Sequence, residues 1–247
     1  MSLAESPCTL VIPTSEIGRF VLFTLALAGT VKPDNSLVSM QCSASVTENL
    51  NSALRQFHPD HQTVWIMGDD HVWDSSVLMD MLRIMDENPE VDILVPLVVK
   101  RNPPWHPVIV QSLGQTSDEG IPMFETVKWE EIPEKGLLEI DAAGSAGMLI
   151  KRWVIDELEQ PWFYSTPSTD GRTALLNEDF TFCTYAKTIG ARIFCTADVV
   201  IGHLGVFNVR PLFRNGQWGA LTEFSTPMEQ FRHMLLPVEY VMAGEET

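Results

Sequence analysis

Basic residues are scarce in this chain of 247 residues. It has 16 Lys and Arg against 33 Asp and Glu, which gives a formal net charge of −17. A surface this negative repels phosphate backbones, so we expect no nucleic-acid binding. An anionic substrate would need a metal ion or a few placed Arg and Lys side chains to offset its charge.

Cysteine is also rare, and no C-x-x-C pair occurs. The four residues are Cys8, Cys42, Cys183 and Cys195, and each lies in an apolar stretch. This pattern favours small buried core residues of a reduced, cytoplasmic protein. Two disulfides in a secreted protein are the alternative.

Long apolar runs are missing as well. The most apolar run, Phe20 to Gly29, is far shorter than the ~20 residues that span a bilayer. The opening residues MSLAESP lack the basic segment and the apolar core of a signal peptide. We therefore expect no membrane span and a cytoplasmic location.

Two common nucleotide-binding fingerprints do not occur. The chain has neither G-x-G-x-x-G nor G-x-x-x-x-G-K-[ST], which argues against a Rossmann dinucleotide site and a phosphate loop. The nearest small-residue segment is Ala142 to Gly147. Its small side chains would let a ligand pack against the backbone, or would simply let a strand pack tightly on a helix.

Apolar runs alternate with helical periodicity in the first part of the chain. The runs predict strands, and the periodic segments predict helices. The expected strands are 8–13, 37–41, 63–67 and 91–97, and the expected helices are 16–28, 46–57 and 75–85. Ser45 and Glu48 form a capping box for the second helix, and Asp74 or Ser75 would cap the third. This alternation is typical of a doubly wound α/β fold with a mostly parallel, Rossmann-like sheet flanked by helices.

The pattern changes after residue 100, where several prolines mark irregular chain. Residues 111–136 are polar and rich in turn signals. Further along we expect strands at 148–150, 192–195 and 198–201, and helices that end near Leu158 and Ile189. No strong periodicity follows Gly205 until 228–236.

Three polar motifs lie where elements begin or end. Gly68-Asp69-Asp70-His71 follows an apolar strand, and the carboxyl ends of such strands are where α/β sheets bind ligands. Oxygen and nitrogen ligands of this kind suit Mn²⁺ or a similar ion, although a polar turn is the simpler alternative. Glu178 and Asp179 open a helix, where they would stabilise the helix dipole or supply a general base. His203 lies in Gly202-His203-Leu204-Gly205, as a structural loop residue or as a distant metal ligand.

The order of these motifs resembles that of GT-A glycosyltransferases, in particular family-2-like and phage-type members. The resemblance covers about residues 8–205. It rests on Pro13-Thr14-Ser15 after the first strand, Asp69-Asp70-His71 as a D-x-D-like motif, the small residues before Met148, the helix that opens with Glu178-Asp179, and His203. His71 stands where most members have Asp, as in the D-x-H motif of polypeptide N-acetylgalactosaminyltransferases. Glu48-Asn49 stands where the family tends to have Arg-Asn.

The resemblance implies a set of site residues and a cofactor. Asp69, His71 and His203 would bind Mn²⁺ or Mg²⁺. Asp179, with Glu178, would act on the acceptor. The donor would contact Pro13, Thr14, Ser15, Asn49, Asp69, Asp70, Gly144 and Ser145.

The implied reaction moves a sugar from a nucleotide-diphosphate sugar to a saccharide or another hydroxyl acceptor. A UDP-sugar is the expected donor, on its frequency in the family. Asp179 would act as general base if the reaction inverts the anomeric carbon, and would position substrate if it retains configuration. A catalytically decayed nucleotide-sugar-binding module, a nucleotidyltransferase and a metal-dependent phosphoesterase are the alternatives. Residues 1–205 would form the glycosyltransferase domain, and 206–247 a C-terminal extension acting as a lid or an acceptor-side segment.

Overall fold

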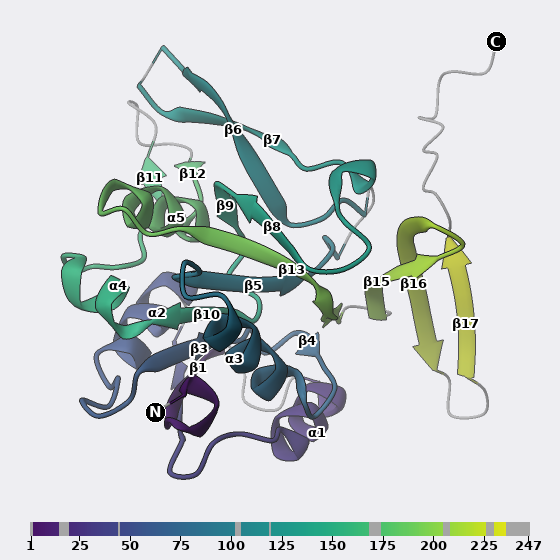
Figure 1. Ribbon diagram of the computed structural model, residues 1–247, viewed down its shortest axis with the longest axis horizontal. Coiled ribbons are helices and arrows are strands. Elements are labelled where there is room, and N and C mark those ends of the chain that lie inside the picture. Colours follow the sequence, from purple (N-terminus) through teal and green to yellow (C-terminus); the bar gives the residue numbers. More distant parts are fainter. Residues whose placement is uncertain are drawn as a thin grey trace.

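A seven-stranded sheet forms the centre of the computed structural model (Figure 1), in the order β2-β1-β3-β10-β5-β13-β8. Its strands are β1 (Cys8–Thr14), β2 (Leu37–Cys42), β3 (Thr63–Ile66), β5 (Ile93–Leu97), β8 (Leu137–Ile140), β10 (Met148–Lys151) and β13 (Ile193–Val200). Strands β8 and β10 run against the direction shared by the others. The structure describes residues 2–14, 20–43, 45–101, 105–118, 120–167, 174–204, 208–225 and 230–235. The mostly parallel sheet expected from the sequence is confirmed.

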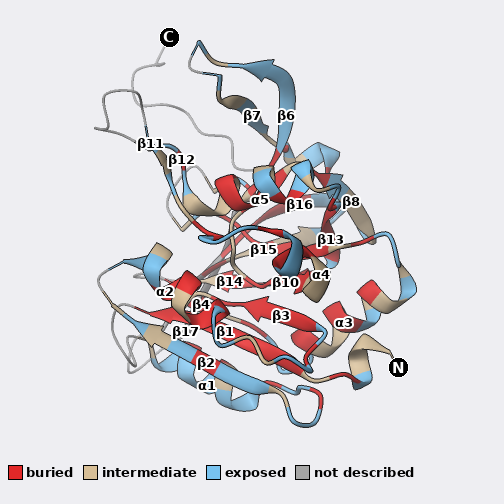
Figure 2. Ribbon diagram, turned by 90° about the vertical axis from the view of Figure 1, so that its left-hand side faces the viewer, coloured by how far each residue is buried: buried red, intermediate tan, exposed pale blue. Residues whose placement is uncertain are grey.

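Helices cover both faces of this sheet. They are α1 (Val21–Gly29), α2 (Val46–Leu54), α3 (Val77–Glu87), α4 (Arg152–Glu157) and α5 (Glu178–Thr188), with short 3₁₀ turns η1 (Leu3–Glu5) and η2 (Trp129–Glu131). Leu50 of α2 and Phe182 of α5 join one apolar cluster, whereas Phe23 of α1 and Leu78 of α3 join the other. The central strands of the sheet, such as β1 and β3, therefore form a buried middle layer and are drawn red in Figure 2, whereas the edge strand β2 is mostly exposed.

The central strands are buried on both faces, which explains their continuous apolar sequence. In β1, Val11 belongs to one cluster and its neighbour Leu10 to the other. All residues of β1, β3 and β5 are buried. Strands covered on both sides need no polar face, so apolar runs rather than alternation mark them in the sequence.

A second sheet joins the end of the chain to the centre. Its order is β17-β16-β15-β14-β4. The strands are β4 (His71–Val72), β14 (Gly202–His203), β15 (Asn208–Arg214), β16 (Gln217–Ser225) and β17 (Gln230–Leu235). The sequence shows no strong periodicity between Gly205 and residue 228, yet this part of the chain contributes the strands β15 and β16. The two-residue loop Asn215-Gly216 has positive φ angles at both positions, as a tight hairpin turn requires.

The described residues form two further small sheets. One contains β6 (Ile109–Thr116), β7 (Pro122–Thr126) and β9 (Ala142–Ala143), and the other contains β11 (Thr166–Pro167) and β12 (Ala174–Leu176). The segment 111–136, which the sequence marks only as polar and rich in turn signals, thus includes a β-hairpin. Its strands expose most of their side chains, so they lack the apolar pattern of a buried strand.

Several predicted boundaries need correction. The two strands expected at 192–195 and 198–201 are one strand, β13, whose pairing with β5 is irregular between Thr196 and Val200. The helix expected from residue 16 begins at Val21, and residues 15–19 lie outside the described part of the chain. Ser45 caps α2 as predicted, by accepting a hydrogen bond from the backbone N–H of Glu48. The N-cap of α3 is Ser76 rather than Asp74 or Ser75.

The cysteines and helices bear on two earlier expectations. The chain has no disulfide; Cys8, Cys183 and Cys195 are buried, whereas Cys42 is exposed and does not belong to the core. Among the described residues, every helix is too short or too polar to cross a lipid bilayer. The cytoplasmic location stays a prediction.

Candidate functional site

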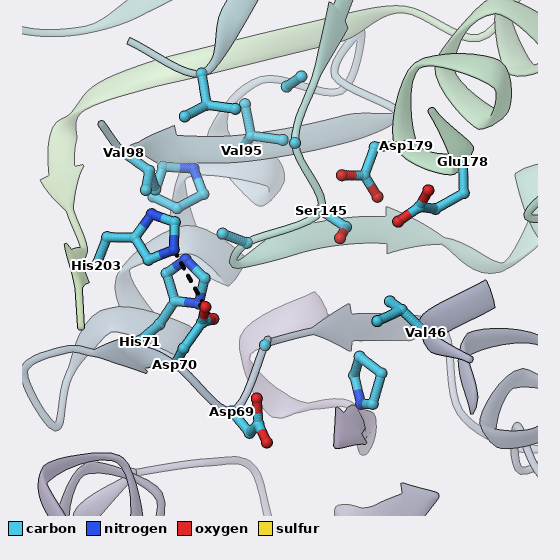
Figure 3. A pocket seen from close by; sticks show the side chains of 17 residues that line it. Val46, Asp69, Asp70, His71, Val95, Val98, Ser145, Glu178, Asp179 and His203 are labelled. Atoms are coloured by element: carbon cyan, nitrogen blue, oxygen red, sulfur yellow. Dashed lines mark hydrogen bonds and ion pairs between the residues drawn. The ribbon is translucent and has the colours of Figure 1, made fainter. Parts of the chain in front are cut away.

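A cleft with a volume of about 300 Å³ opens at one edge of the central sheet (Figure 3). It lies beyond the carboxyl ends of β1, β3 and β5, which meet at this edge because the three strands run in the same direction. Segments far apart in the chain line it: Pro13, 68–71, 143–146, Glu178-Asp179 and His203. The prediction that residue 203 lies near the acidic turn at 69–71 is confirmed.

The acidic turn connects two sheets. Strand β3 ends at Ile66, and after Gly68 the chain turns into the short strand β4 at His71. In β4, His71 pairs in antiparallel register with His203 of β14. The two imidazoles are therefore brought together by main-chain pairing, and their rings stack with centroids 4.4 Å apart.

Asp70 joins these two histidines in a compact cluster. Its Oδ1 lies 2.9 Å from His71 Nδ1, and its Oδ2 lies 3.3 Å from His203 Nε2. One ligand atom from each of the three residues lies within 4.8 Å of the others. In the described residues this is the one group of histidine, cysteine and acidic side chains close enough to share a metal ion.

The hydrogen bonds around the cluster fit a cation. His203 Nδ1 lies 3.0 Å from the Val99 carbonyl and donates its proton there, so the lone pair of Nε2 faces Asp70. A lone pair and a carboxylate repel each other unless a proton or a metal ion lies between them. The buried Nδ1 of His71 has no partner in hydrogen-bond geometry, although it is close to Asp70. A divalent ion bound by oxygen and nitrogen atoms would satisfy all three groups.

The protonation states agree with this arrangement. Burial alone would raise the pKa of Asp70, but its interactions with the nearby imidazoles of His203 and His71 hold the pKa well below its ordinary value. Burial lowers the pKa of His71, because the charged imidazolium is poorly solvated there. At neutral pH the cluster therefore holds an ionised carboxylate and a neutral imidazole, the forms that bind metals.

Arg101 adds a positive charge beside the cluster. Its Nη1 lies 3.1 Å from Asp70 Oδ2, at the edge of the cleft. Its guanidinium is more than a third exposed, so it can also meet an anionic ligand in the opening. In the sequence, Lys100-Arg101 is a basic pair that could neutralise phosphates, although such a pair on an exposed loop is usually only solvated.

Asp69 has different partners from Asp70. Its Oδ2 accepts a hydrogen bond of 2.5 Å from the hydroxyl of Thr14, at the end of β1. The buried side chain of Asn49 donates to the Thr14 carbonyl at 2.9 Å and so holds this strand end in place. Asp69 lines the cleft without joining the cluster, and Thr14 and Asn49 support the wall behind it. Ser15 lies outside the described residues.

Two carboxylates face the cluster from the opposite side of the cleft (Figure 3). Glu178 and Asp179 form the first turn of α5, where backbone N–H groups favour negative charge. Burial raises the pKa of Asp179 to about 6, and the neighbouring charge of Glu178 adds to the rise. The hydroxyl and N–H of Ser145 offset part of it. Asp179 Oδ1 is buried and has no hydrogen-bond partner.

The small residues of segment 144–147 are required by close packing. A Cβ on Gly144 would lie 2.8 Å from a methyl group of Val108 and 3.8 Å from Asp179 Oδ2. Gly147 has a φ of +72°, and a Cβ there would lie 2.6 Å from Pro96. Both interpretations of this segment therefore apply. Gly144 and Ser145 line the cleft, where a ligand could pack against them, and the backbone also packs tightly against its neighbours.

The cleft thus unites most of the predicted site residues. Of the predicted metal ligands, His71 and His203 lie in the cluster, and the carboxylate beside them belongs to Asp70. Sequence alone could not distinguish Asp69 from Asp70, since both follow the same strand. Their separate environments arise from the turn before β4.

Solved structures with a similar fold are glycosyltransferases of the GT-A type. The crystal structure of A197 from STIV has a TM-score of 0.56 and 16% identity, and the match covers 82% of this chain and 88% of that one. The crystal structure of GalNAc-T7 with UDP, GalNAc and Mn²⁺ has a TM-score of 0.54 and 9% identity, over 81% of this chain and 44% of that one. No protein-family model and no curated protein matches the sequence. The chain therefore has the GT-A fold.

Proposed function

We propose that this chain with the GT-A fold is a metal-dependent glycosyltransferase. It moves a sugar from a nucleotide-diphosphate sugar, with a UDP-sugar as the expected donor, to a hydroxyl of a saccharide or another acceptor. One observation carries the proposal: a compact cluster of one carboxylate and two imidazoles, with ligand atoms close enough to share a cation, faces a carboxylate of raised pKa across one cleft at the carboxyl edge of the sheet.

The cluster side of the cleft would bind the diphosphate of the donor. Asp70, His71 and His203 would hold Mn²⁺ or Mg²⁺, and Asp69 lies next to them at the wall formed by Thr14. The bound ion supplies a Lewis acid that offsets the charge developing on the leaving diphosphate. The ion matters here because the protein itself has a net charge of −17. Arg101 would add a direct hydrogen bond to a phosphate oxygen.

The opposite side would bind the acceptor. Asp179 would accept the proton of the attacking hydroxyl, and its pKa of about 6 makes it ionised and moderately basic near neutral pH. Ser145 would orient its carboxylate. This role requires inversion at the anomeric carbon; with retention, Asp179 would position the sugar instead. The anomeric configuration of the first product, followed by NMR, distinguishes the two.

The first test is donor binding and turnover with a panel of nucleotide sugars. We expect one donor to raise the melting temperature only when Mn²⁺ is present, and to be hydrolysed slowly without an acceptor. Excess EDTA should remove both effects, and added Mn²⁺ should restore them. Full turnover in the chelator would contradict the metal-dependent mechanism.

Matched variants assign the effect to the cluster. Asp70→Asn should weaken Mn²⁺ binding and abolish Mn²⁺-dependent donor binding, since it removes the charge that both imidazoles face. Asp74→Asn is the control, because it changes an exposed carboxylate between β4 and α3. This variant should leave Mn²⁺ binding and Mn²⁺-dependent donor binding unchanged. Equal effects of the two variants would remove Asp70 from the site. Tight donor binding without any hydrolysis or transfer would indicate a binding module instead of an enzyme.

A further inference from the structure

A second cleft, with a volume of about 260 Å³, lies between η2 and the hairpin of β15 and β16. It shares no residue with the candidate site. Its lining residues are Trp129, Glu130, Ile132, Phe213, Gly216, Gln217 and Trp218. Three of the seven are aromatic, and they come from segments that the sequence separates widely.

The aromatic walls are held firmly. Phe213 and Trp218 are cross-strand neighbours in the hairpin, with ring centroids 5.3 Å apart. The indole N–H of Trp218 donates to the Pro133 carbonyl at 3.1 Å, which ties the hairpin to the segment after η2. Trp129 packs beside Trp218, with centroids 6.4 Å apart and a small angle between the rings. A ligand would therefore meet a preformed surface.

Polar side chains stand at the rim of these rings. Trp129 and Phe213 are only partly buried, while Glu130 and Gln217 are exposed. Aromatic faces suit the C–H face of a pyranose ring, and a carboxylate and an amide at the rim suit its hydroxyl groups. None of the described lining residues is basic, so the chemistry favours a neutral saccharide over an anionic ligand.

The five-stranded sheet β17-β16-β15-β14-β4 contributes residues to both the second cleft and the candidate site. Strand β15 pairs with β14, where Val209 lies opposite His203. Phe213 follows Val209 on the same face of β15, roughly 13 Å further along the strand. Val99 packs with Val209, and its carbonyl accepts the hydrogen bond from His203. This distance along β15, from the residue opposite His203 to Phe213, is longer than a single sugar ring and suits a short oligosaccharide.

We propose that the cleft at Trp129 and Trp218 binds a distal part of a neutral oligosaccharide acceptor. The role as an acceptor rests on the proposed function, since the acceptor hydroxyl must reach Asp179. The binding of an oligosaccharide rests only on the geometry of the second cleft. The hairpin of β15 and β16 would then be an acceptor subsite, and longer acceptors should bind better than monosaccharides.

Binding is tested first without donor or metal. The probes are cellotriose, maltotriose, mannotriose and N-acetylated chitotriose, with saturation-transfer NMR and titration calorimetry on the full chain. We expect one of them to bind, and Trp129→Ala to weaken that binding about ten-fold, equivalent to about 1.4 kcal/mol. Tyr185→Ala, an exposed aromatic residue on α5, is the matched control and should leave the affinity unchanged.

Two further variants keep the test decisive if Trp129→Ala does not fold. Glu130→Gln and Gln217→Ala change exposed side chains and should each weaken binding of the same trisaccharide severalfold. In transfer assays these variants should raise the KM of the trisaccharide and leave its kcat, the donor KM and donor hydrolysis unchanged. Failure of all four probes to bind, or unchanged affinity in the folded variants, would overturn the inference. Trisaccharide binding that depends on this cleft, in a protein that hydrolyses no donor, would support the subsite and contradict the proposed function.

Discussion

Replacing Asp179 with Asn should stabilise the folded protein at neutral pH while it removes sugar transfer. The carboxyl lies at the start of α5, with one oxygen buried and without a hydrogen-bond partner. Burial and the charge of Glu178 raise its pKa from 3.8 to about 6. The fold therefore favours the protonated form, which an amide mimics in shape and charge.

The pKa shift sets the size of the effect. One pKa unit corresponds to about 1.4 kcal/mol, so ionising Asp179 inside the fold costs about 3 kcal/mol. The carboxyl also borders an open cleft, where solvent offsets part of this cost. We therefore expect the free energy of unfolding of Asp179→Asn to exceed that of the wild type by about 2 kcal/mol at neutral pH. For a protein of this size, that is a rise in melting temperature of about 4–8 °C.

The sign follows from linkage. A carboxyl whose pKa is higher in the folded state binds its proton more tightly there, so folding benefits fully below pH 3.8. The benefit is lost as the pH rises from there to about 6. The wild type should therefore match Asp179→Asn near pH 4 and become progressively less stable than the variant up to about pH 6. Above that pH the gap should stay constant.

Urea denaturation of both proteins at several pH values between about 4 and 8 measures this gap. Asp60→Asn is the matched control, because the Asp60 side chain is 87% exposed and its charge is well solvated. Transfer should fall about 10²–10⁴-fold in Asp179→Asn, with donor binding retained. A gap that does not change with pH would refute the argument from burial. Normal turnover in the variant would refute the role as base.

The remaining predictions concern the pH profile and the metal cluster. Glu178→Gln removes the charge that helps to raise the pKa of Asp179, so the pH midpoint of kcat at saturating donor and Mn²⁺ should move down; a midpoint that stays or rises would contradict this coupling. Gly68→Ala places a Cβ 3.0 Å from an atom of His71 and should weaken Mn²⁺ binding in calorimetry, whereas Gly29→Ala meets nothing within 4 Å and should not; equal affinities would show that the turn adjusts freely. His203→Ala should abolish Mn²⁺-dependent donor binding in a thermal-shift assay, and an unchanged shift would remove His203 from the cluster.

The fold could be predicted largely because its core strands are buried on both faces. Continuous apolar runs such as Thr63–Ile66 mark such strands directly, and capping by Ser45 marks a helix start. The peripheral strands were missed because their side chains are mostly exposed, as in Ile109–Thr116. One local signal was present: Asn215-Gly216 is a strong hairpin turn sequence, and it connects β15 to β16 as such a turn should.

The candidate site was predictable as a set of motifs in order, but not as an arrangement of atoms. The sequence places carboxylates or histidines after strands and at a helix start, and parallel strands carry such residues to one edge. Which atoms meet is a tertiary property. Asp70 rather than Asp69 lies beside the imidazoles because the turn into β4 directs the two adjacent side chains to different partners.

By itself, the sequence determined the layered α/β architecture, the scarcity of positive charge, and the residues available for chemistry, since these depend on local pattern and composition. Only the tertiary structure decided that His71 and His203 stack, that Arg101 reaches Asp70, and that the hairpin after residue 208 builds an aromatic cleft with η2. The physical reason is that strand pairing and burial act between residues more than a hundred positions apart. No local pattern in either segment encodes the register in which they meet.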